Sequence, residues 1–309
     1  MLRPLLPIAA AAAAIAGEAA PPQPGWVLTF ADEFDRPGRP DPAKWTFEEG
    51  FKRNQELQWY LGENAVVDSG NLVLEARRVQ VPNPRFDPKA PKEDWRRSRR
   101  TVEYTSASAW TKHTFAWRYG RMEVRARFTA AAGLWPAIWT LGITGEWPFN
   151  GEVDVFEYYK DTVLANLAWG HPNRGEATWR DVRTPIRELG GPGWDQAFHT
   201  WTMDWSPERI ELALDGRVLN RTSLAETRNP DRGASSGIDN PFHQPHFILL
   251  NLAIGGNNGG DPAKTPFPSR YLIDHVRIWQ PPEVLRVSAT AAAAAATAAP
   301  LAVDLRRKP

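Results

Sequence analysis

The feature that most constrains the fold is a period of two in the hydrophobicity of several short segments. In residues 119–128 (YGRMEVRARF), four apolar side chains alternate with three arginines and a glutamate. Alternate side chains of a β-strand lie on opposite faces, so this pattern indicates a strand with one buried and one solvated face. Further segments that we predict to be strands are residues 71–76, 151–159, 199–205, 209–214 and 271–279.

The connections between these strands favour an antiparallel arrangement. They contain Gly, Pro, Asp and Asn, and Asp215-Gly216 predicts a tight hairpin. Sustained helical periodicity is scarce. Many short strands joined by turns are typical of a β-sandwich. We therefore predict an all-β fold, a sandwich of two antiparallel sheets, in one domain over residues 26–281.

The two ends of the chain differ from this domain. Arg3, the apolar run LLPIAAAAAAIAG and small residues at a cleavage site predict a secretory signal peptide over residues 1–19. An uncleaved anchor is the alternative, although the apolar run is too short to span a bilayer. Residues 20–25 form a Pro-rich linker, and residues 282–309 an Ala-rich, low-complexity tail. We expect a secreted or periplasmic protein that leaves the membrane after signal cleavage.

Composition excludes some classes of function. The chain has 37 basic and 36 acidic side chains, and this near-zero net charge argues against a nucleic-acid partner. The absence of cysteine excludes disulfides and thiolate metal sites. Fifteen tryptophans suit either a β core or platforms for stacking sugars. We expect a monomer.

Residues 151–159 (GEVDVFEYY) carry the chemistry. Glu152 and Asp154 share one face of the predicted strand, but Glu157 has the opposite parity. A β-bulge at Val155–Phe156, which adds one residue to the strand, would return Glu157 to the acidic face. Three acids are poor core material, so we expect them to line a wet groove.

Such a groove suits glycoside hydrolysis. In a retaining glycosidase two carboxyl groups lie about 5 Å apart, one as nucleophile and one as acid and base. A Ca²⁺ site is the alternative use of three clustered acids.

Several segments, in order and with the expected spacing, resemble glycoside hydrolase family 16. They are WVLTFADEFD (26–35), NQELQWY (54–60), SGNLVLEARR (69–78), YGRMEVRARF (119–128), GLWPAIWTLG (133–142), GEVDVFEYY (151–159), FHTWTMDW (198–205) and ILLNLAIGG with FPSRYLIDHVRIWQ (248–280). The resemblance implies a jelly-roll sandwich with a concave substrate cleft. The E-x-D-x-x-E spacing is that of the bulged, laminarinase-like members, since lichenase-type members have one residue fewer.

The resemblance also implies roles for the acids and a substrate class. Glu152 would be the nucleophile, Asp154 its electrostatic assistant and Glu157 the general acid and base, with no cofactor for catalysis. The implied activity is a secreted endo-β-1,3-glucanase acting on a polysaccharide. Agarase- or porphyranase-like β-galactan hydrolysis, transglycosylation and non-catalytic carbohydrate binding remain alternatives.

Residues that would bind substrate follow from the same resemblance. Asn54 matches a position that hydrogen-bonds a sugar near the point of cleavage, with a turn asparagine as the alternative. Stacking platforms are expected from the tryptophans in and beside the catalytic segments, for which core packing is the alternative: Trp135, Trp139, Trp147 and Trp169. Trp169 lies near the place where β-1,3-glucanases of the family have a histidine, so the pocket is expected to differ there.

Two other groups of residues are candidates for binding. The resemblance implies a structural calcium on the convex face, near Glu33, Gly70 and Asp274, although Asp274 could be an ordinary strand-end acid. The run WRRSRR (95–100), inside an expected surface loop over residues 80–101, could bind an acidic polysaccharide. A solvated charged loop is the favoured interpretation of that run.

Overall fold

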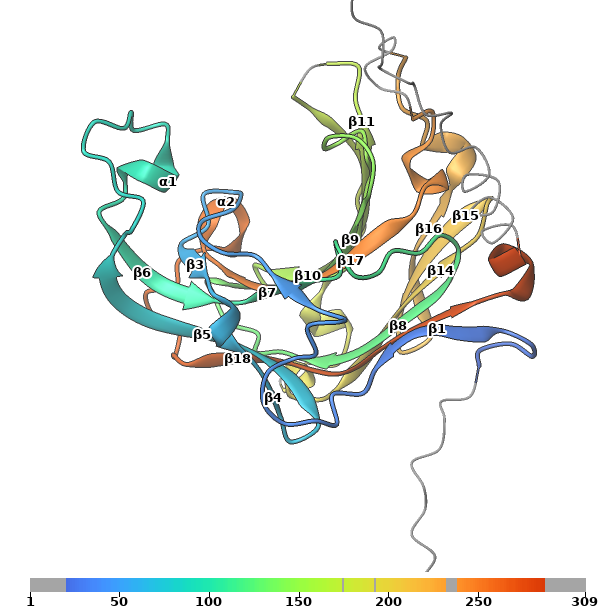
Figure 1. Ribbon diagram of the computed structural model, residues 1–309, viewed down its shortest axis with the longest axis horizontal. Helices are drawn as coiled ribbons and strands as arrows, with labels where there is room; N and C mark the ends of the chain where they lie inside the picture. Colours follow the sequence, from blue (N-terminus) through green and yellow to red (C-terminus); the bar gives the residue numbers. More distant parts are fainter. Residues whose placement is uncertain (1–20, 174, 192, 232–237, 287–309) are drawn as a thin grey trace, which may run out of the picture.

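Two curved β-sheets stack face to face to form the protein (Figure 1). The computed structural model describes residues 21–173, 175–191, 193–231 and 238–286. The predicted signal peptide lies outside the described residues, as does the predicted tail beyond residue 286; residues 282–286 are helical. Within the described part of the chain, no helix is long and apolar enough to cross a membrane.

The outer sheet has ten strands among the described residues, in the order β16-β15-β14-β8-β18-β5-β6-β3, with β1 beside β18 and β4 beside β5. Its strands are β1 (Val27–Asp32), β3 (Gln58–Tyr60), β4 (Ala65–Asp68), β5 (Asn71–Pro82), β6 (Thr101–Ser106), β8 (Gly120–Arg127), β14 (His199–Trp205), β15 (Arg209–Leu214), β16 (Arg217–Ser223) and β18 (Ser269–Gln280).

The inner sheet has eight strands in the same described ranges, in the order β12-β11-β10-β9-β17-β7-β2, with β13 also beside β11. Its strands are β2 (Thr46–Phe47), β7 (Ser108–Trp110), β9 (Leu134–Gly142), β10 (Glu152–Tyr159), β11 (Thr162–Gly170), β12 (Ala177–Arg180), β13 (Arg183–Pro185) and β17 (His246–Ile254).

Helices are short and lie in the connections. They are α1 (Trp95–Ser98), α2 (Gly256–Gly259), η1 (Gly62–Asn64), η2 (Ile186–Glu188), η3 (Trp194–Gln196), η4 (Leu224–Glu226) and η6 (Pro241–His243). The predicted all-β sandwich is confirmed. All its described strand pairs are antiparallel except the parallel pair β3–β6.

The period-two pattern places the core between the sheets. In β8, Met122, Val124 and Ala126 are fully buried in the main hydrophobic cluster, whereas the charged residues of the strand are half-buried on the convex face. The cluster includes residues from Phe30 to Ile278. The inner sheet therefore has one face in this core and leaves its other, concave face for a cleft.

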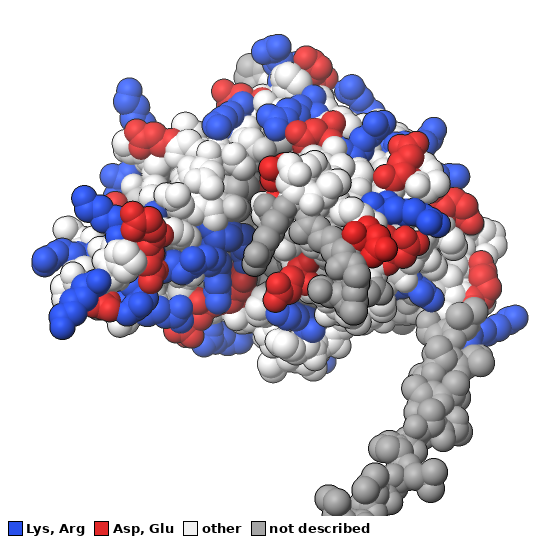
Figure 2. Space-filling model, turned by 90° about the horizontal axis from the view of Figure 1, so that it is seen from above, with Lys and Arg blue, Asp and Glu red and all other residues white. Residues whose placement is uncertain are grey.

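Two structures rise beside the concave face. Figure 1 shows β11 curving upward on one side and the β5–β6 hairpin, with α1 at its tip, on the other. Lys and Arg side chains gather at the hairpin end of the molecule (Figure 2). These arginines have partners: Arg97 pairs with Asp87, and the guanidinium of Arg100 lies 5.1 Å from the ring centre of Phe86.

Candidate active site

The acids of β10 reach the concave face because the strand is bulged. Pairing with β9 shifts register between Asp154 and Phe156, and pairing with β11 shifts between Asp154 and Glu157. As a result Val155 and Phe156, although adjacent, both pack into the core. The bulge predicted at these two residues is therefore present, and it returns Glu157 to the face of Glu152 and Asp154.

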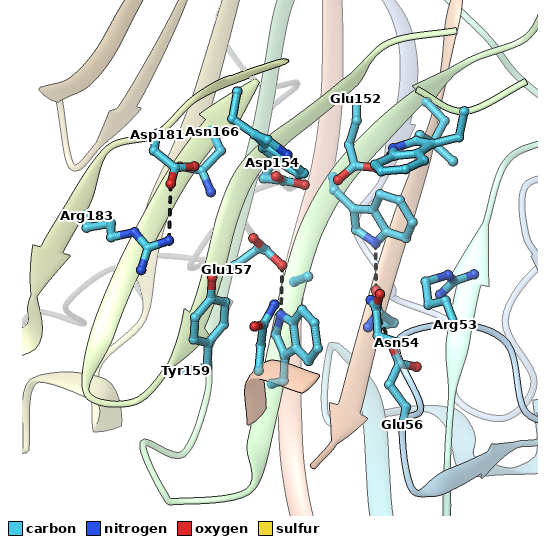
Figure 3. A pocket seen from close by; sticks show the side chains of 18 residues that line it. Arg53, Asn54, Glu56, Glu152, Asp154, Glu157, Tyr159, Asn166, Asp181 and Arg183 are labelled. Atoms are coloured by element: carbon cyan, nitrogen blue, oxygen red, sulfur yellow. Dashed lines mark hydrogen bonds and ion pairs between the residues drawn. The ribbon is translucent and has the colours of Figure 1, made fainter. Parts of the chain in front are cut away.

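A cleft of about 630 Å³ covers these acids (Figure 3). Its walls combine aromatic rings, carboxylates, amides and two guanidinium groups. The lining residues include Arg53, Asn54, Glu56, Trp135, Trp139, Trp147, Glu152, Asp154, Glu157, Tyr159, Asn166, Trp179, Asp181, Arg183 and Asn251. A cleft of this size, lined by aromatic rings and convergent polar groups, has the character of a substrate site.

An indole N–H holds each of the two glutamates. Trp135 Nε1 donates to Glu157 Oε1 at 2.7 Å, and Trp147 Nε1 donates to Glu152 Oε2 at 2.8 Å. Trp147 is 47% exposed, so its ring also borders the solvent. These hydrogen bonds fix the orientation of both carboxyl groups in the cleft.

Burial perturbs the titration of the three acids. Burial raises the pKa of Glu157 to about 8, and the charges of Glu152, Asp181 and Glu56 act in the same direction. Burial also raises the pKa of Glu152 to about 7. The pKa of Asp154 is raised well above its usual range by burial and then by its two glutamate neighbours. Such groups hold and exchange protons near neutral pH.

The loop before β3 forms one end of the cleft. Asn54 Nδ2 donates to Glu56 Oε1 at 3.3 Å, and Gln58 Nε2 donates to Glu56 Oε2 at 2.7 Å. Asn54 has a left-handed backbone, φ 54°, and Arg53 forms an ion pair with Glu48. The structure thus places Asn54 in the cleft together with Arg53 and Glu56, which sequence reasoning missed.

Arg99, which directly follows α1, holds this loop from the outside. Arg99 donates from Nη2 to the backbone oxygen of Gln55 at 2.8 Å and from Nη1 to that of Glu56 at 2.5 Å. Its guanidinium also lies 4.7 Å from the ring centre of Trp95. Arg97, Arg99 and Arg100 of the run WRRSRR therefore contact other residues of the protein. The favoured interpretation, a solvated charged loop, did not predict these contacts.

The predicted tryptophans divide into two sets. Trp135, Trp139 and Trp147 line the cleft, and Trp139 Nε1 donates to Asn251 Oδ1 at 2.6 Å. Trp169 does not, because it belongs to the main core with Leu167. Its assignment as a stacking platform is corrected: β11 alternates, so odd-numbered residues face the core while Asn166 faces the cleft.

The other end of the cleft comes from β12, β13 and their connection. Trp179, Asp181 and Arg183 all line it, and Arg183 Nη2 lies 3.1 Å from Asp181 Oδ2. Sequence reasoning missed these residues. The strands that carry Trp179 and Arg183 are too short to show an alternating pattern in the sequence, and their position is set by pairing with β11.

The predicted calcium ligands are engaged in other interactions. Both carboxylate oxygens of Glu33 accept from Arg277, and Asp274 Oδ2 lies 3.1 Å from Arg125 Nη1. Among the described residues there is no group of three or more His, Asp or Glu side chains that could hold a metal. The carboxylates of Glu33 and Asp274 pair with different arginines. The calcium site stays a prediction.

A jelly-roll sandwich with paired glutamates on a bulged strand in its concave cleft defines a polysaccharide-cleaving glycoside hydrolase. Comparison with known proteins agrees. The model of the glycosyl hydrolases family 16 matches residues 53–274. The chain therefore belongs to this family, as the sequence resemblance indicated, and its activity is that of an O-glycosyl hydrolase.

Relatives and solved structures extend this similarity. A β-glucanase of Rhodothermus marinus is 32% identical over 274 residues, 83% of this chain and 86% of the relative. A glucan endo-1,3-β-glucosidase of Cryptopygus antarcticus is 34% identical, over 77% of this chain and 84% of the relative.

Two solved structures share the fold at similar identity. The laminarinase catalytic domain of Thermotoga maritima has a TM-score of 0.66 at 31% identity, over 82% of this chain and 98% of that domain. A structure from work on endo-acting O-glycanases of the human gut microbiota has a TM-score of 0.76 at 32% identity, over 87% of this chain and 96% of that one.

Proposed function

We propose that this protein is a retaining endo-β-1,3-glucanase that is exported from the cell. The observation that carries the mechanism is the bulge in β10, since it brings Glu152 and Glu157 to one face of the cleft with an indole N–H on each. The substrate class is supported by the glucanase relatives. Export is supported by the predicted signal peptide.

The first step breaks the glycosidic bond. Glu152 attacks the anomeric carbon as a carboxylate, while Glu157 gives its proton to the departing glycosidic oxygen. A protonated Asp154 assists, because Asp154 beside Glu152 acts to lower the pKa of that nucleophile. The result is a glycosyl ester on Glu152 and a released sugar with a free hydroxyl group.

The second step frees the enzyme. Glu157, now a carboxylate, takes a proton from water, and the water oxygen attacks the anomeric carbon. The bond to Glu152 breaks as the bond to water forms. Each of the two steps inverts the anomeric carbon, so its configuration is retained overall. A sugar hydroxyl in place of water would give transglycosylation through the same intermediate.

The charges in the cleft are close to balance, which suits a neutral glycan. Among its described lining residues, Arg53 and Arg183 are cationic. In the first step Glu152 is a carboxylate, whereas Asp154 and Glu157 each hold a proton and are neutral. A neutral glycan such as a β-1,3-glucan needs no excess of either charge for its recognition.

A panel of polysaccharides tests the proposal. We expect release of reducing sugar from laminarin, less from mixed-linkage glucan, and little from agarose or porphyran. Glu152→Gln and Glu157→Gln should each lower turnover by at least about 10²–10⁴-fold. Glu226→Gln, at the exposed end of η4, is the matched control. Near-normal turnover in either cleft variant would refute the mechanism.

An endo-acting O-glycanase is the second candidate. It is favoured by the TM-score of 0.76 with the O-glycanase-related structure, against 0.66 for the Thermotoga laminarinase domain. Mucin O-glycans belong in the same panel. Faster release from them than from laminarin would decide for this candidate.

A further inference from the structure

The strands β12 and β13 extend the concave sheet beyond β11, and two of their residues lie in register with the two glutamates of β10. Glu152 pairs with Ala168 of β11, which pairs with Trp179 of β12. Glu157 likewise pairs with Leu164, which pairs with Arg183 of β13. Trp179 and Arg183 therefore lie two strand spacings, about 10 Å, from the two glutamates and on the same face of the sheet.

Trp179 has the exposure of a binding platform. It is 44% exposed, whereas Trp135 and Trp139 of the same cleft are each 6% exposed. A large ring that borders a polar cleft leaves apolar surface in contact with water. The apolar C–H face of a sugar ring would cover that surface by stacking.

Asp181 and Arg183 supply hydrogen-bonding groups beside this ring. Their ion pair is open to solvent, with side-chain exposures of 42% and 60%. An exposed pair of this kind adds little to stability. Its guanidinium donors and carboxylate acceptors are free to bind the hydroxyl groups of a sugar that stacks on Trp179.

The two glutamates give the cleft a direction. In Figure 3, Glu157 lies on the side of Asp181 and Arg183, and Glu152 on the side of Arg53. A general acid protonates the departing oxygen, so the sugar that departs lies beyond Glu157.

We propose that Trp179, Asp181 and Arg183 form a subsite for the sugar ring on the leaving-group side of the bond that is cleaved. This inference rests on the proposed roles of Glu152 and Glu157. In the second step the same subsite would hold an acceptor sugar. It would therefore raise transglycosylation relative to hydrolysis.

Two substrates of the same sugar test the subsite. One is an oligosaccharide of the polysaccharide that the wild type cleaves, in which a sugar departs. The other is the corresponding β-glycosyl fluoride, in which fluoride departs and no sugar occupies the leaving-group side. We expect Trp179→Ala to lower kcat/KM for the oligosaccharide roughly three- to tenfold, and to change it less than about twofold for the fluoride.

Further variants separate recognition from folding. Trp179→Phe keeps a flat ring and should retain most of the oligosaccharide activity, whereas Arg183→Ala should lose it selectively. Arg221→Ala removes an exposed ion pair with Glu211 on the outer sheet, 2.6 Å long, and should leave both substrates unaffected. Equal losses on both substrates in Trp179→Ala, or no loss on the oligosaccharide, would overturn the subsite. The polysaccharide panel decides the proposed function independently.

Discussion

At the residue scale, the proposed mechanism depends on the protonation of Glu157 and Glu152. Their pKa values, about 8 and about 7, exceed the ordinary glutamate value because both half-buried residues lose hydration at the carboxyl group inside the cleft. A proton held near neutral pH on Glu157 can be given to a leaving group, which an ordinary exposed glutamate could not do.

The pH dependence of kcat/KM should follow from these two groups. Activity requires ionised Glu152 and protonated Glu157, so it should rise as pH increases through about 7 and fall as pH increases through about 8. The two limbs belong to the coupled cluster. Asp181→Asn should move the alkaline limb to lower pH, because the charge of Asp181 raises the pKa of Glu157. An unmoved alkaline limb in this variant would contradict the assignment.

The sequence identified the residues whose placement depends on local parity. The three acids lie on one strand, where the parity of residues 151–159 and one bulge put them on one face. The cleft tryptophans Trp135, Trp139 and Trp147 came instead from the family resemblance. The prediction that Trp169 is a stacking platform was wrong. Trp169 is three residues from Asn166, so on a regular strand the two side chains lie on opposite faces, and Asn166 faces the cleft. Arg53, Glu56 and Arg183 lie in the cleft through long-range pairing and loop geometry, which a single sequence does not display.

At the scale of one element, the bulge in β10 can be tested by deletion. Removal of Val155 leaves E-x-D-x-E, which keeps all three acids on one face without a bulge. Removal of Val153, also fully buried, places Glu152 on the opposite face from Asp154. Each deletion loses the burial of one valine, about 1.5–3 kcal/mol.

We therefore expect residual turnover in the Val155 deletion and none in the Val153 deletion, at similar losses of thermal stability. Reducing-sugar release and thermal unfolding on the two purified variants check this. Equal inactivation of two folded variants would show that parity alone does not set the site.

Arg99, which directly follows α1, provides a second test at this scale. Arg99→Ala removes hydrogen bonds to the backbone oxygens of Gln55 and Glu56, which belong to the loop that carries Asn54. A looser loop should raise KM severalfold and change kcat little, because the catalytic acids are on β10. Arg100→Ala, whose guanidinium lies over Phe86, is the control. A drop in kcat alone in steady-state kinetics would argue against this positioning role.

For the whole molecule, the buried carboxyl groups link stability to pH. Glu56, Glu152 and Glu157 have folded-state pKa values of about 7, 7 and 8, above the ordinary value of 4.5. The folded protein therefore binds more protons than the unfolded chain between pH 4.5 and 8, and stability is lost as pH rises through this range.

Thermal unfolding should show this dependence. The Tm should fall as pH increases from 5 to 9, and Glu157→Gln should reduce the slope because it removes one titrating group. Calorimetry of both proteins across this range measures the difference. A Tm that increases with pH over the range would contradict the raised pKa values.

The sandwich as a whole was predictable because alternation and turns are local signals. Predicted strands at residues 199–205 and 209–214 coincide with β14 and β15. The edge strands β2, β3, β12 and β13 have two to four residues each and were not predicted. Segments this short contain too few positions for a period to appear, so only pairing with a neighbour defines them.

The position of β12 and β13 at the margin of the inner sheet has a further consequence. Among the described strands they pair with β11 alone. Their side chains can therefore change without disturbing β10, which carries the acids. Exchanging β12 and β13 for the corresponding strands of a relative should therefore transfer that relative's preference for the departing sugar and leave the acids of β10 unaltered.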